Sequence, residues 1–96
     1  MIHKVLKDSD RPLGHRYRLI ERIWKVEKSD RHPEGVEFTF QLLRKTDDGW
    51  IHALRIDNQL HEGKPGVHIH RSGYVEWKDM SIKEAAKMIR GYAYED

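Results

Sequence analysis

Apolar and polar residues alternate most clearly over residues 36–43, where Phe38 and Phe40 are separated by polar side chains. A repeat of two places alternate side chains on opposite faces of a β-strand, so this pattern predicts a strand with one buried face. The Asp-Gly pair at positions 48 and 49 favours a tight hairpin turn. Residues 50–57 are therefore predicted to return as the antiparallel partner strand.

Strand parity divides this partner segment into two faces, one with Trp50, His52, Leu54 and Ile56 and the other with Ile51, Ala53, Arg55 and Asp57. Three more segments are predicted as strands. Residues 17–28 alternate but carry apolar groups on both faces, which is typical of a strand covered on two sides. Residues 67–71 and 74–77 flank a tight turn and are predicted to form a second hairpin.

The two ends of the chain differ in character. Residues 1–14 are predicted to be a loosely held arm, with at most a short edge strand at Val5 and Leu6. At the other end, Ser81 and Glu84 have the spacing of a capping box that begins a helix. The apolar residues that follow recur at the spacing of one helical face: Ile82, Ala85, Ala86 and Ile89. Such a stripe can be buried only against the sheet.

These elements predict an α+β fold, an antiparallel meander of four or five strands with one C-terminal helix packed on a face. Hydrophobic residues make up 38% of the 96 residues and charged residues 35%. The length favours a single domain over residues 1–96, because two separate cores would each be too small. The abundance of Lys, Arg and Glu beside few Asn and Gln favours a thermophilic source.

Composition also narrows the function. The chain has no cysteine, which excludes disulfides, thiolate zinc sites and a cysteine nucleophile. No apolar run approaches the roughly 20 residues of a membrane helix, and no secretory signal is seen, so a cytoplasmic protein without membrane contact is expected. The net charge of +2 is below that of a dedicated duplex-DNA binder. Phosphate-binding glycine loops and dinucleotide fingerprints are absent, and no cofactor is expected.

Candidate chemistry concentrates in residues 54–77. His68 and His70 are predicted to point to one face of a strand, since they are two residues apart. Two imidazoles near neutral pKa could divide the roles of base and acid, as metal-free RNA cleavage requires. Asp57 could orient one ring, and Arg55 could hold a phosphate. These four residues are the predicted catalytic group.

Four further residues are predicted to assist in binding: Asn58, His61, Lys64 and Arg71. Each member of the cluster also has a simpler interpretation. Asp57 and Asn58 suit the end of a strand, because both residue types bond their own backbone. Arg55 could form a cross-strand ion pair, and the two histidines could be solvated or bind a metal ion with His61 or Asp57. No known zinc spacing is present, so no metal ligand is assigned.

The residues Arg55-x-Asp57-Asn58, a glycine-containing linker, the segment Gly66-Val67-His68-Ile69-His70 and the Ser81 helix start together resemble the small TumE-like proteins of prokaryotic toxin–antitoxin systems. The likeness covers about residues 53–90. It implies a cytoplasmic toxin that pairs with a DNA-binding antitoxin protein, with Arg55, Asp57, Asn58, His68 and His70 as the active residues. The acid–base chemistry of His68 and His70, rather than the resemblance, makes RNA the expected substrate. The alternatives are a non-catalytic interaction module, including a homodimer, and a metal-binding protein that uses His68 and His70.

Overall fold

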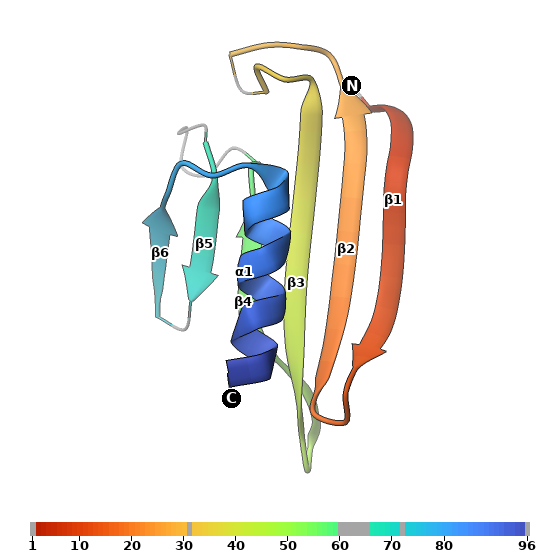
Figure 1. The fold of residues 1–96 in the computed structure, drawn as a ribbon, viewed down its shortest axis with the longest axis vertical. Coiled ribbons are helices and arrows are strands. Elements are labelled where there is room, and N and C mark those ends of the chain that lie inside the picture. Colours follow the sequence, from red (N-terminus) through yellow and green to blue (C-terminus); the bar gives the residue numbers. More distant parts are fainter. Residues whose placement is uncertain (1, 31, 60–65, 72, 96) are drawn as a thin grey trace.

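The computed structural model describes residues 2–30, 32–59, 66–71 and 73–95. Six antiparallel strands form one sheet in the order of the sequence, followed by a helix (Figure 1). The elements are β1 (Ile2–Leu13), β2 (Tyr17–Val26), β3 (Val36–Thr46), β4 (Gly49–Asp57), β5 (His68–Arg71), β6 (Tyr74–Trp77) and α1 (Ile82–Glu95). The predicted meander with one C-terminal helix is confirmed, but the prediction of four or five strands is wrong.

The additional strand is β1, which pairs with β2 over the segment expected to be a loosely held arm. The residues that pair this segment with β2 are charged, and hydrophobic patterning does not detect them. Asp8 and Asp10 point to one face of the sheet and form ion pairs with Arg22 and Arg18 of β2. Cross-strand pairs of opposite charge favour strand pairing, so β1 needs few apolar residues to join the sheet.

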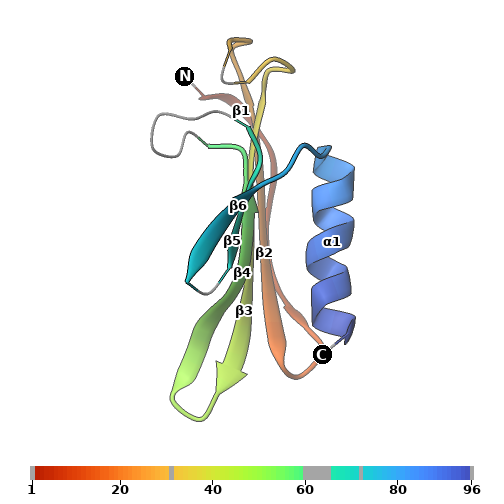
Figure 2. The same ribbon diagram turned by 90° about the vertical axis from the view of Figure 1, so that its left-hand side faces the viewer.

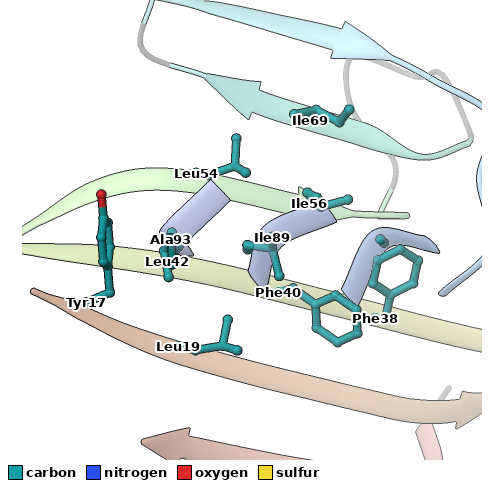
Figure 3. Packing of buried hydrophobic residues seen from close by; sticks show 11 residues of the cluster. Tyr17, Leu19, Phe38, Phe40, Leu42, Leu54, Ile56, Ile69, Ile89 and Ala93 are labelled. Atoms are coloured by element: carbon teal, nitrogen blue, oxygen red, sulfur yellow. The ribbon is translucent and has the colours of Figure 1, made fainter. Parts of the chain in front are cut away.

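The hydrophobic core lies between the sheet and α1, which covers one face (Figures 1 and 2). Figure 3 shows the buried side chains that fill it: Tyr17, Leu19, Phe38, Phe40, Leu42, Leu54, Ile56, Ile69, Ile89 and Ala93. The face predicted for β3 and the apolar stripe predicted for α1 are thus both confirmed. Burial of large apolar side chains on this face contributes roughly 1.5–3 kcal/mol for each residue.

The helix begins at the predicted capping box. The Glu84 amide donates to Ser81 Oγ at 3.1 Å, and the Ser81 amide donates to Glu84 Oε1 at 3.1 Å. These two bonds satisfy backbone amides that the helix itself leaves without a partner. Over the described part of the chain, no helix is both long and apolar enough to cross a membrane.

An irregularity in β4 changes the faces predicted for its first half. Leu54 lies opposite Leu42, but His52 lies opposite Leu43, so β4 holds one extra residue at this point. Residues before the extra position lie on the other face from the one that simple alternation assigns. The prediction that Trp50 and His52 share a face with Leu54 is therefore wrong.

Candidate active site

The register between β4 and β5 brings the predicted catalytic residues to one place. Arg55 lies opposite His70, and Asp57 lies opposite His68. Residues directly opposite each other in an antiparallel pair project to the same face. All four side chains therefore lie on the face that points away from α1, which we call the open face; Figure 2 shows α1 on the other side of the sheet.

Asp57 is the centre of this group. Its side chain is buried, with the residue only 2% exposed. Oδ2 lies 2.9 Å from Arg55 Nε and 3.1 Å from His70 Nε2, and Oδ1 accepts a hydrogen bond from the Gln59 amide at 3.1 Å. A carboxylate removed from water in this way orients both the guanidinium and the imidazole.

The two histidines have different environments. His68 is fully buried, and its ring packs edge-on against Trp77 with centroids 5.0 Å apart. Its Nδ1 lies 3.7 Å from Asp57 Oδ1. The side chain of His70 is 22% exposed. The prediction that His68 and His70 share a face is confirmed. The alternative that both rings are solvated is wrong for His68, which is fully buried.

The burial of His68 limits what the pair can do. A fully buried ring does not contact a substrate in this conformation, so division of acid and base roles between His68 and His70 is not supported by the geometry. His70 and Arg55 are the members of the group that reach the surface, with Arg55 37% exposed at its side chain. His68 instead lies buried beside Asp57, with its Nδ1 near Asp57 Oδ1.

Gln59 has a place in the cluster that the sequence did not indicate. Its Nε2 donates to Glu37 Oε1 at 3.1 Å and to Thr39 Oγ1 at 3.2 Å, while its Oε1 accepts from Arg55 Nη2 at 3.4 Å. Gln59, the second residue after the end of β4, thus turns back over the open face and holds the Arg55 guanidinium. An isolated glutamine in a connection has no motif by which this role could be recognised.

His52 is a second residue that sequence reasoning missed. Its side chain is on the exposed part of β4, and its Nε2 donates to the His70 carbonyl at 3.3 Å. The register shift in β4 brings His52 to the open face beside His70. Alternation along the sequence assigns His52 to the core face, so only the pairing of the strands reveals its position.

The predicted binding residues are not all part of this site. The Asn58 side chain bonds the backbone of β3, accepting from the Phe38 amide at 2.8 Å and donating to the Val36 carbonyl at 2.8 Å. Arg71 follows His70 and lies on the opposite face, where it pairs with Glu76 at 3.2 Å. The prediction that Arg71 joins the His70 group is wrong, because neighbouring strand residues point to opposite faces.

His61 and Lys64 lie outside the described residues. Within the ranges that the structure covers, no group of three His, Asp or Glu side chains is arranged to hold a metal ion. The alternative of a metal site at His68 and His70 therefore receives no support from these residues. The geometry that remains is a His70–Asp57 pair beside an exposed guanidinium and a second histidine, which is suited to proton transfer near an anion.

Comparison of the chain with protein-family models, with curated proteins and with solved structures gave no match. The resemblance to TumE-like proteins consequently stays a prediction.

Proposed function

We propose that this chain is a TumE-like, toxin-type protein that cleaves RNA by metal-free acid–base chemistry at the open face. The observation that carries the proposal is the contact between His70 Nε2 and Asp57 Oδ2 at 3.1 Å beside Arg55. A carboxylate that holds one imidazole nitrogen orients the ring and stabilises its protonated form. His70 can then accept a proton through Nδ1.

The proposed reaction needs a base, an acid and a group that stabilises negative charge. His70 takes the proton of a ribose 2′-hydroxyl, whose oxygen attacks the adjacent phosphorus. The bond to the 5′-oxygen breaks, and protonated His52 donates a proton to that leaving group. Arg55 stabilises the charge on the phosphate. The products are a cyclic phosphate and a free 5′-hydroxyl.

His52 is assigned the role of acid in place of His68. It is exposed, and its contact with the His70 carbonyl holds it beside the proposed base. His68 is assigned a positioning role, because its buried ring lies between Trp77 and the Asp57 carboxylate.

The test is cleavage of total cellular RNA by the purified chain with EDTA present. His70→Gln and His52→Gln are each expected to lower the rate by about 10²–10⁴-fold, since general acid–base groups typically contribute that much. His15→Gln is the matched control, because His15 is an exposed histidine in the turn between β1 and β2. Its rate is expected to equal that of the wild type.

Two results would overturn the proposal. One is the absence of any cleavage by the wild-type chain, together with no effect on growth when it is expressed. The other is cleavage that His70→Gln leaves unchanged. If an antitoxin-type partner exists, its co-expression should suppress the growth defect of the wild type, in keeping with the TumE-like resemblance.

A second candidate is an interaction module that forms a homodimer through the edge of the sheet. The observation in its favour is that Val5 and Leu6 on the edge strand β1 are exposed by 54% and 49%. An exposed apolar edge can pair with another strand. Light scattering is expected to show a dimer that Val5→Lys dissociates. A monomer at all concentrations would contradict this candidate.

A further inference from the structure

A pocket of about 670 Å³ lies on the α1 side of the sheet, between the helix and the end of β5, away from the His70 group. The apolar part of the lining comes from Leu54, Met80 and Met88. Leu54 is buried, and both methionines are partly buried against the core. The apolar floor of the pocket is therefore formed by side chains that are packed against the core.

The sequence of α1 keeps this space open. Gly91 lines the pocket, and a Cβ added there would meet nothing within 4 Å. Helical glycine costs about 1 kcal/mol relative to alanine, so a glycine with free space beside it is not explained by close packing. A larger side chain at position 91 would occupy part of the pocket.

The polar part of the lining is mainly positive. Three cationic side chains, Arg71, Lys78 and Lys87, stand against one carboxylate, Glu84, among the described lining residues. Arg71 also bonds Glu76 at 3.2 Å, and Glu84 accepts from the Ser81 amide in the capping box. Counting Glu76 with its partner still leaves an excess of one positive charge at the pocket, which favours an anion.

An aromatic ring completes the lining. Tyr92 belongs to α1, one residue beyond Gly91, and it is exposed rather than packed in the core. An exposed ring beside an apolar floor can stack on a planar heterocycle, and methionine side chains adapt to such a surface. Lysine ammonium groups nearby suit a phosphate.

We infer that this pocket binds a nucleotide unit, with the base against Tyr92 and the methionines and the phosphate at Lys78 and Lys87. The shared chemistry is that of a nucleoside monophosphate, free or as one residue of an RNA strand. The site is independent of the proposed reaction, because Arg71 and His70 point to opposite faces of β5. Inorganic phosphate is expected to bind more weakly than a nucleotide, because it can contact the cationic side chains but cannot stack on Tyr92 or pack against the apolar lining.

The test is calorimetric titration of the full chain with 5′-AMP, with adenosine and inorganic phosphate titrated separately. Saturable AMP binding is expected, with both fragments binding more weakly. Lys87→Glu is expected to weaken AMP binding by about tenfold or more, because it removes a charge-assisted contact and adds repulsion. Lys83→Glu makes the same charge change on the exposed surface of α1 outside the pocket lining, and little effect is expected.

Two further variants separate the parts of the site. Tyr92→Ala is expected to weaken AMP binding by roughly fivefold or more through lost stacking, while phosphate binding is unchanged. Gly91→Leu is expected to block AMP by filling the pocket. Circular dichroism of each variant checks that the helix is intact.

The inference is overturned if AMP shows no saturable binding at millimolar concentration, or if Lys83→Glu and Lys87→Glu weaken binding equally. His70→Gln should bind AMP as the wild type does, so failure of the RNA-cleavage proposal leaves this test intact. A short oligoribonucleotide that binds much more tightly than AMP, with the same dependence on Lys87, identifies RNA as the source. Equal affinity identifies free nucleotide.

Discussion

At the scale of single residues, Asn58 uses both ends of its side-chain amide on the backbone of β3. Its Oδ1 accepts from the Phe38 amide and its Nδ2 donates to the Val36 carbonyl, each at 2.8 Å. The end of β4 is thereby tied to the start of β3. This bond pair also fixes the chain next to Asp57, so Asn58 positions the site without contacting a substrate.

Asn58→Ala is expected to lower the free energy of unfolding by about 1–3 kcal/mol, because two partly buried backbone groups lose their partners. Asn58→Asp tests the same bonds with nearly the same shape. It can accept from the Phe38 amide but cannot donate to the Val36 carbonyl, so it should also destabilise. Urea unfolding measures both, and a midpoint for Asn58→Asp equal to that of the wild type would contradict this account.

At the scale of elements, α1 owes its beginning to the contact between Ser81 and Glu84. The pKa of Glu84 lies below the ordinary value of 4.5. The main cause is its hydrogen bond with the backbone of Ser81, followed by the hydrogen bond with the Ser81 side chain, and the charge of Lys78 has a smaller effect. A carboxyl group whose pKa is lowered in the folded state stabilises the fold at pH values above its ordinary pKa. That contribution is lost as the pH falls through the lowered pKa.

Glu84→Gln is therefore expected to unfold at a lower temperature than the wild type at neutral pH, with the difference shrinking as the pH falls below 4.5. Glutamine keeps the capping geometry and removes only the charge. Ser81→Ala, which removes the cap hydroxyl, should cost about 1 kcal/mol. Circular dichroism during heating, at several pH values, measures the unfolding temperatures of each variant and of the wild type. A pH-independent difference for Glu84→Gln would show that charge is not involved.

At the scale of the whole molecule, Glu21 connects three elements. Its buried carboxylate, 1% exposed, lies on the α1 side of β2 and contacts Lys7 at 3.1 Å, Arg11 at 3.6 Å and Arg90 at 3.0 Å. Lys7 and Arg11 belong to β1, and Arg90 belongs to α1. The edge strand and the helix are thus held to the same point on the sheet.

Glu21→Gln is expected to lower the free energy of unfolding by about 1–3 kcal/mol, because charge-assisted bonds become neutral ones. The loss should stay below the roughly 3–5 kcal/mol of a fully buried pair, since the three cations keep contact with water. Glu34→Gln, at an exposed residue of the connection between β2 and β3, is the matched control. Equal urea midpoints for the two variants would rule out this role for Glu21.

The sequence by itself determined the features that depend on local periodicity. Alternation of apolar and polar residues located β2 to β6, and the spacing of Ser81, Glu84 and the apolar stripe located α1. The same parity put His68 with His70 and Arg55 with Asp57, since side-chain direction in a strand repeats every two residues.

Only the tertiary structure decided how these pieces combine. The register between β4 and β5 brought Arg55 and Asp57 to the face of His68 and His70, and an extra residue in β4 added His52. His68 is a fully buried group whose ring lies against Trp77. The physical reason is that register, strand irregularities and burial depend on partners distant in the chain, which local alternation does not specify.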